Sequence, residues 1–200
     1  MVDVGPLIMG HRLSTRETFG AYTALTYEKG SLVLRMLHFL FTDTQTGEGQ
    51  AFFDMMSEFV REHKNGTAST EQFFALAGER AQKTPLGQKY GYKNLDWFFR
   101  QWVVQSYFPS YRLEYHIEDA PGGGAMLVGA IFQDGVPDSE QWFMPLPLVI
   151  HLPGGKMARG TIAAYGAKAP VKVKLPQKPE KVELDPDLWV LSDKTSVSKQ

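Results

Sequence analysis

The chain has 200 residues, no cysteine and a net charge of −1 at pH 7. This length is enough for one or two globular domains with a buried core. The balanced charge gives no electrostatic reason to expect nucleic acid or an anionic membrane as a partner, and the lack of cysteine excludes disulfides and thiolate metal sites. No apolar stretch reaches the length of a membrane-spanning segment.

Residues 1–24 are predicted to be irregular, because Gly5-Pro6, Gly10 and Gly20 interrupt any regular pattern. His11 and Arg12 are the residues of this strip that could contact a ligand. A solvated pair is the more common role for such residues.

The apolar run that follows predicts a helix over residues 31–41, with one broad apolar face. Tyr27 is expected at or just before its first turn, where free backbone N–H groups and the positive end of the helix dipole meet. A phenol there could donate a hydrogen bond to a developing oxyanion. The alternative is a packing residue with a solvated hydroxyl.

Three more helices are expected at residues 51–63, 70–82 and 95–105. Ser69 and Gln72 have the spacing of a capping box at the start of the third helix. Residues 83–93 are expected to be a polar loop. The first 108 residues are therefore predicted to form a helical part.

The periodicity changes at Pro109. Tyr111, Leu113 and Tyr115 alternate with polar residues, as in a half-buried strand, and further short strands follow at regular spacing. Residues 109–192 are predicted to form a small antiparallel β-sandwich of six or seven strands, followed by a disordered tail, 193–200. The expected fold class is α+β.

Three features of the second half suggest other chemistry. Residues 122–124 are three glycines, but they lie between strands and open no helix, so they do not indicate a phosphate site. Glu183, Asp185 and Asp187 are better explained as a turn than as a calcium loop. The lysines between 168 and 181 lack interleaved aromatic residues and are expected to be a solvated edge.

Four segments resemble, in the same order, parts of the aminopeptidase-N-like zinc peptidases (family M1, the gluzincins). The most specific is the Tyr-Glu-Lys-Gly run in Leu25–Leu37. The others are the glycine-flanked lead-in Gly5–Ser14, the pair Thr67–Phe74 and Leu95–Trp102, and the segment Val182–Leu191. The resemblance implies the C-terminal half of a thermolysin-like catalytic domain followed by the β domain of that family.

In that family the tyrosine of this run stabilises the tetrahedral intermediate that forms when zinc-bound water attacks a peptide carbonyl. The resemblance carries this role to Tyr27 alone. The H-E-x-x-H motif that supplies zinc ligands and the general base is absent, because His11, His38, His63, His116 and His151 are scattered. We therefore expect the zinc and the peptide substrate in a longer parent protein, and neither a cofactor nor activity in this chain alone.

Two functional hypotheses remain. The chain is the C-terminal part of a zinc metallo-aminopeptidase, or it is a non-catalytic binding or scaffold module of the same architecture. Under the first hypothesis the helices would normally pack against an N-terminal, zinc-bearing half. Without that half we expect an exposed apolar face and self-association through it.

Overall fold

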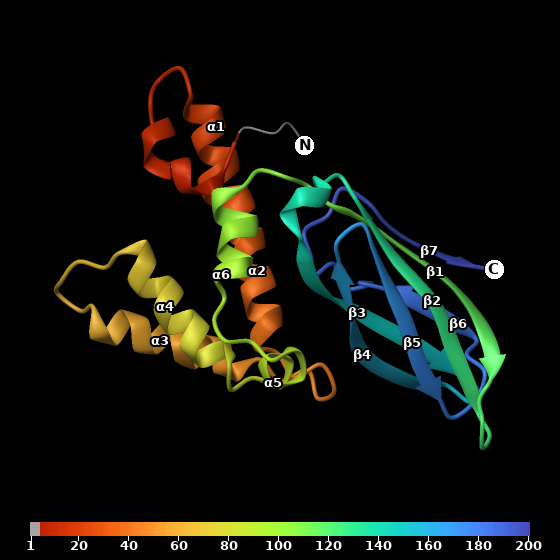
Figure 1. Cartoon of the computed structure of the whole chain (residues 1–200). Coiled ribbons are helices and arrows are strands. Elements are labelled where there is room, and N and C mark those ends of the chain that lie inside the picture. Colours follow the sequence, from red (N-terminus) through yellow and green to blue (C-terminus); the bar gives the residue numbers. More distant parts are fainter. Residues whose placement is uncertain (1–4) are drawn as a thin grey trace. The chain divides into compact units, whose positions relative to one another are not determined.

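The computed structural model describes residues 5–200 and divides into two compact units, one ending at Ser106 and the other formed by Tyr107–Gln200. The first unit is helical and the second contains two β-sheets (Figure 1). The predicted α+β class, with a helical part followed by a sandwich-like part, is confirmed. In the described part of the chain, every helix falls short of the length or hydrophobicity needed to cross a membrane.

The helical unit begins with a helical stretch that the sequence did not predict. The segment η1 (Leu7–Leu13) is a 3₁₀ helix with a kink at Gly10, and it precedes α1 (Phe19–Thr23). A π-helical turn, η2 (Ala24–Lys29), joins α1 to α2 (Gly30–Phe41) without a break. The expectation that residues 1–24 are irregular is wrong for Leu7–Leu13 and for Phe19–Thr23, because Gly10 forms a kink inside η1 and Gly20 is accommodated inside α1. Residues 14–18 are irregular as predicted, and residues 1–4 lie outside the described part.

The remaining helices are α3 (Gln50–Glu62), α4 (Thr70–Ala81), α5 (Pro85–Tyr90) and α6 (Asp96–Phe99), and α6 continues into a second π-helical turn, η3 (Arg100–Val104). The predicted capping box at the start of α4 is confirmed by two hydrogen bonds: Ser69 N–H donates to Gln72 Oε1 at 2.7 Å, and Gln72 N–H donates to Ser69 Oγ at 3.2 Å.

The predicted loop 83–93 instead contains α5. Thr84 caps this helix by accepting a hydrogen bond from the Gly87 N–H at 3.0 Å, and Pro85 occupies the first turn. Gly91 ends the helix with a positive φ of 66°. The prediction of a loop was wrong because it relied on the polar composition of the segment and overlooked the residues that begin and end a short helix.

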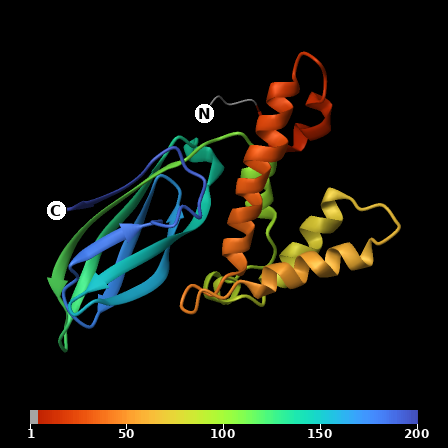
Figure 2. The same cartoon turned by 180° about the vertical axis from the view of Figure 1, so that it is seen from behind.

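The core of the helical unit forms where α2 packs against α3 and α5. Figure 2 shows the ribbon of this unit from behind. The most deeply buried large side chains of this unit are Leu25, Met36, Leu37, Phe39, Leu40, Phe41, Met55, Leu86, Phe98 and Trp102. They recur at helical spacing on α2, as the sequence pattern predicts.

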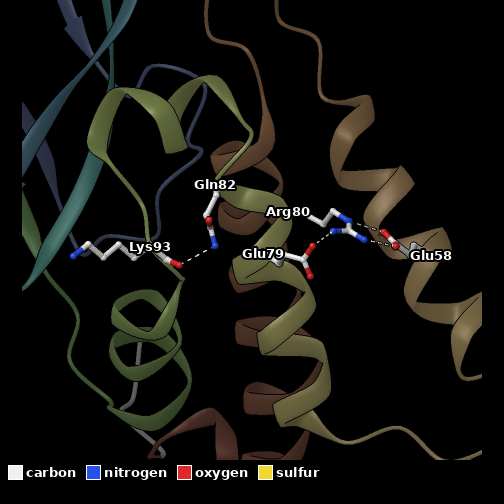
Figure 3. A network of polar contacts seen from close by, with 5 residues as sticks. All are labelled: Glu58, Glu79, Arg80, Gln82 and Lys93. Carbon is white, nitrogen blue, oxygen red and sulfur yellow. Dashed lines mark hydrogen bonds and ion pairs between the residues drawn. The ribbon is translucent and has the colours of Figure 1, made fainter.

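A polar network ties α3 to α4 on the outside of this core (Figure 3). Arg80 of α4 donates from Nε to Glu58 Oε2 of α3 at 2.7 Å, and its two terminal nitrogens pair with Glu58 and Glu79. The hydrogen bonds from Arg80 lower the pKa of Glu58 below its usual value of 4.5. The Gln82 amide then reaches the Lys93 carbonyl at 2.9 Å, beyond the end of α5.

The second unit has two sheets with strand orders β5-β2-β1-β7 and β4-β3-β6. The strands are β1 (Ser110–Asp119), β2 (Ala125–Asp134), β3 (Phe143–Leu152), β4 (Lys156–Tyr165), β5 (Lys168–Leu175), β6 (Lys181–Leu184) and β7 (Thr195–Lys199). Tyr111, Leu113 and Tyr115 point to the buried face of β1, as their alternation predicts.

The expected disordered tail 193–200 is different in the structure. Residues 195–199 form β7, which pairs with β1 in parallel, so the sheets are not purely antiparallel. The Tyr111 N–H bonds to the Lys194 carbonyl at 2.8 Å and the Gln200 N–H bonds to the Tyr115 carbonyl at 2.9 Å. The polar composition of the tail suits an edge strand, whose side chains are largely solvated.

Candidate functional site

A groove of about 590 Å³ opens on the helical unit. Its walls come from η1, η2, α2, the start of α4 and the α6–η3 segment, and we call it the Tyr27 groove. It is lined by Leu7, Ile8, Gly10, His11, Thr26, Tyr27, Gly30, Ser31, Val33, Leu34, Leu37, Thr70, Phe73, Phe74, Phe99 and Val103. Most of these side chains are apolar, and Ile8, Tyr27 and Leu34 keep 52%, 61% and 41% of their surface exposed. A concave, largely apolar surface with few polar groups is typical of a ligand site.

Tyr27 lies inside the π-helical turn η2, not at a helix start. The expectation that free backbone N–H groups surround it is wrong, because the chain is already helical from Phe19 onward and the Gly30 N–H bonds back to the Leu25 carbonyl. What Tyr27 offers to the groove is therefore its exposed phenol. π-helical turns inside α-helices occur frequently at functional sites.

Tyr27 is packed against the ring of Tyr22, which lies in the segment before it. Its ring meets the ring of Tyr22 edge-on, with centroids 5.8 Å apart and planes at 90°. Tyr22 in turn meets His11 edge-on at 6.5 Å and lies 6.2 Å from Phe19. The neighbouring phenol of Tyr27 raises the pKa of the Tyr22 hydroxyl above its usual value of 10.0.

Lys29, two residues after Tyr27, turns inward. Only 3% of it is exposed, and its Nζ donates to the Gln105 carbonyl at 3.4 Å, directly after η3. A buried ammonium is tolerated only with polar partners, so this contact ties the two π-helical turns together beneath the groove. The Tyr-Glu-Lys-Gly run thus combines an exposed phenol with a buried anchor.

The side chains present do not fit a zinc site. Among residues 5–200, no three His, Asp or Glu side chains gather in a way that could hold a metal ion. Three of the histidines have other partners: His63 Nδ1 lies 2.9 Å from the Phe59 carbonyl, His116 pairs with Glu118 at 2.8 Å, and His151 pairs with Glu183 at 2.6 Å. His11 lines the groove, and His38 stacks on the ring of Phe52 and meets the ring of Phe53 edge-on.

The acidic residues near the C-terminus stabilise a turn. Asp185 has a φ of 47°, and its carboxylate accepts hydrogen bonds from the Trp189 and Val190 N–H groups at 2.8 and 2.9 Å. Asp187 pairs with Arg159 at 3.2 Å, and Glu183 with Lys181 at 2.6 Å. These contacts agree with the turn interpretation of this segment.

The sequence pointed to Tyr27 but missed most of the groove. His11 was considered, and the structure brings it to the same groove. Phe73, Phe74 and Phe99 follow ordinary core spacing in their helices, so nothing in the sequence separates them from core residues. Tyr22 lies five positions before Tyr27, a spacing that becomes informative only once a π-helical turn is known.

Comparison with known proteins supports the fold. No protein-family model and no curated protein matches the chain. A solved structure of Legionella pneumophila aminopeptidase A, in complex with aspartic acid, matches 88% of this chain with a TM-score of 0.60 and 14% identity. The chain spans 18% of that protein's length. The likeness shows an aminopeptidase-like fold.

Proposed function

We propose that this chain is the C-terminal part of a zinc metallo-aminopeptidase of the M1, gluzincin type. The observation that carries the proposal is the exposed phenol of Tyr27 on the wall of an apolar groove. The Tyr-Glu-Lys-Gly run and the aminopeptidase-like fold support it.

The role proposed for Tyr27 is to donate a hydrogen bond from its hydroxyl to the oxyanion of the tetrahedral intermediate in peptide-bond hydrolysis. Preorganised donors of this kind act on charge that develops only in the transition state, so they raise kcat rather than substrate affinity. An apolar surround strengthens the bond, because it lowers the local dielectric constant.

The metal belongs to the parent protein in this proposal. The described side chains of this chain do not form a zinc site, so the ligands would have to come from the part of the parent that carries an H-E-x-x-H motif. By itself the chain is expected to hydrolyse nothing, since it would hold neither the metal nor the general base.

The lining of the groove suggests which side chains it accepts. In the described part of the chain, His11 is the one imidazole, and no carboxylate or ammonium lines the groove. The structural neighbour was crystallised with aspartic acid. We nevertheless expect the parent of this chain to hydrolyse peptides with apolar residues faster than peptides with acidic ones, because an unpaired carboxylate in an apolar groove is costly.

The proposal is tested on the full-length parent. Leucine and aspartate chromogenic amides are compared with their N-acetylated forms, before and after zinc is removed with a chelator and restored. We expect turnover of the free-amine leucine amide, its loss on chelation and its recovery with zinc. A parent that binds no zinc and cleaves no substrate would contradict the proposal and support the binding or scaffold module.

A further inference from the structure

The chain contains two asparagines, Asn65 and Asn94, and the structure places them in different surroundings. Asn65 lies in the loop between α3 and α4, and it is exposed together with the two residues that follow it. In the part of the chain that the structure describes, no hydrogen bond or ion pair holds its side-chain amide. The next residue is Gly66, which has no side chain to shield its backbone nitrogen.

Asn94 is held in place on both sides of its own backbone. Its Nδ2 donates to Asp96 Oδ2 at 2.6 Å, and its Oδ1 accepts a hydrogen bond from the Asp96 N–H at 3.2 Å. The residue that follows, Leu95, is fully buried, and its nitrogen lies only 3.2 Å from the point where a Cβ on Gly78 would be. The Asn94 amide and the Leu95 nitrogen therefore cannot approach each other without breaking these contacts.

The backbone at Asn65 is much easier to reorient. Asn65 has a φ of 62°, in the left-handed region that is unfavourable for a residue with a Cβ. The Gly66 N–H donates one hydrogen bond to the His63 carbonyl at 3.1 Å. An exposed loop with few buried contacts opens locally at far lower cost than the unit unfolds. The Gly66 nitrogen can therefore turn toward the Asn65 side chain in the folded protein.

We propose that Asn65 is a site of spontaneous deamidation in the folded chain. The Gly66 nitrogen gives its proton to water or hydroxide and attacks Asn65 Cγ. A new C–N bond closes a five-membered imide, the bond from Cγ to Nδ2 breaks, and Nδ2 leaves as ammonia. Water then opens the imide at one of its two carbonyls, which yields aspartate or isoaspartate. The reaction needs no enzyme, metal or oxidant, so it is independent of the function proposed for Tyr27.

Either product changes the loop between α3 and α4. Both add a carboxylate just beyond the end of α3, where the last carbonyls of the helix already carry partial negative charge. Isoaspartate also adds one carbon to the main chain, inside the turn that the hydrogen bond from Gly66 to His63 closes. This loop leads into α4, whose first residue, Thr70, lines the Tyr27 groove.

The site is tested on the purified 200-residue chain, incubated in mildly alkaline buffer in which circular dichroism shows that it stays folded. Peptide mapping by mass spectrometry follows asparagine, imide, aspartate and isoaspartate at both positions over time. We expect Asn65 to convert at least roughly tenfold faster than Asn94, because only Asn65 can reach the geometry for attack. The rate should rise with pH, since the attacking nitrogen must lose its proton. Equal rates at the two positions would overturn the proposal, and so would conversion of Asn65 only in urea.

The role of Gly66 is tested with Gly66→Ala. Gly66 is outside the left-handed region, and an added Cβ would lie 3.7 Å from the His63 carbonyl oxygen, an ordinary contact, so the variant is expected to fold. We expect its Asn65 to convert roughly tenfold more slowly, because the methyl group hinders ring closure at the nitrogen beside it. Thr67→Val, which removes a hydroxyl one residue further on, should convert at the wild-type rate. An unchanged rate in Gly66→Ala would overturn attack by the Gly66 nitrogen.

Discussion

At the scale of single residues, two side chains of the Tyr-Glu-Lys-Gly run lie in opposite environments, one exposed and one buried. Tyr27 faces the groove and is 61% exposed, whereas Lys29 is 3% exposed and bonds to the Gln105 carbonyl. The two point in different directions from one π-helical turn. Lys29 is therefore expected to matter for stability and Tyr27 for chemistry.

Replacing Lys29 with methionine keeps most of the side-chain volume and removes the ammonium. We expect a loss of about 1–3 kcal/mol in the free energy of unfolding, because the Gln105 carbonyl loses a donor in a partly buried place. Urea denaturation measures it. Lys83→Met, at an exposed position of the same unit, should change stability by less than about 0.5 kcal/mol. Equal effects of the two substitutions would show that Lys29 is not an anchor.

The single residues that could be predicted from the sequence were those that belong to short local motifs. The Tyr-Glu-Lys-Gly run singled out Tyr27, and the spacing of Ser69 and Gln72 predicted a cap that the structure contains. Tyr22 could not be found, because in a regular helix it would point away from Tyr27. Asn65, with a φ of 62°, adopts the left-handed conformation after α3, a position that glycine occupies more often.

At the scale of elements, the close pairing of β1 and β2 depends on a glycine. Gly129 of β2 lies opposite Tyr115 of β1, and a Cβ added to it would come within 2.0 Å of the Glu114 carbonyl oxygen. Gly160 of β4 has no atom within 4 Å of the corresponding position. The two glycines offer a matched comparison within one unit.

We expect Gly129→Ala to destabilise the β unit by roughly 2–3 kcal/mol, because the added methyl must push the two backbones apart. Gly160→Ala should be neutral or slightly stabilising, since glycine weakens a strand interior. Thermal unfolding followed by circular dichroism compares the two. If Gly160→Ala destabilises as much as Gly129→Ala, the effect comes from the loss of glycine and not from the close approach.

The ion pair between α3 and α4 is expected to make the stability of the helical unit depend on pH. The Arg80 hydrogen bonds lower the pKa of Glu58 in the folded state, so the contribution to stability is present above the unfolded-state pKa and is lost as the pH falls through the folded one. We expect the urea concentration at the midpoint of unfolding to decrease as the pH is lowered from about 5 to about 3, and we expect Glu58→Gln to make this decrease smaller.

Glu62→Gln, at the exposed end of the same helix, is the control. A remaining slope would come from other carboxylates such as Glu183, whose pKa is lowered by Lys181. If Glu58→Gln leaves the whole profile unchanged, the pair does not contribute to stability.

At the scale of elements, the periodicity of apolar residues predicted helices and strands well, whereas the polar composition of a segment predicted them poorly. The helices α2, α3 and α4 follow from their apolar spacing, and most of the strands follow from alternation. The polar segments were misjudged: residues 85–90 form α5 and residues 195–199 form β7. Neither element needs an apolar stripe of its own, because α5 is held by its caps and β7 by its ladder with β1.

At the scale of the whole molecule, the order of helices followed by strands was enough to predict an α+β fold, and the structure has it. The groove could not be predicted, because its walls come from segments between Leu7 and Val103 that only the tertiary structure brings together. The chain spans 18% of the length of the aminopeptidase that it resembles.

The exposed apolar residues of the groove lead to an expectation about association. We expect the chain by itself to bind a hydrophobic dye and to self-associate in a concentration-dependent way, because Ile8, Tyr27 and Leu34 are exposed on one surface. Leu34→Lys should reduce both effects in dye titration and sedimentation velocity. Val60→Lys, an exposed apolar position on α3 that does not line the groove, should not. A monomer at all concentrations that binds no dye would contradict this.

The central claim is that the Tyr27 hydroxyl stabilises the transition state of peptide hydrolysis. The most direct measurement is kcat of the full-length parent with Tyr27→Phe, beside the wild type and Tyr165→Phe, at equal zinc content. We expect a loss on the order of 10²–10³ in kcat for Tyr27→Phe, with KM nearly unchanged, and no loss for Tyr165→Phe, whose hydroxyl bonds to Gln141 in the β unit. A Tyr27→Phe variant that keeps its zinc and turns over at the wild-type rate would contradict the claim.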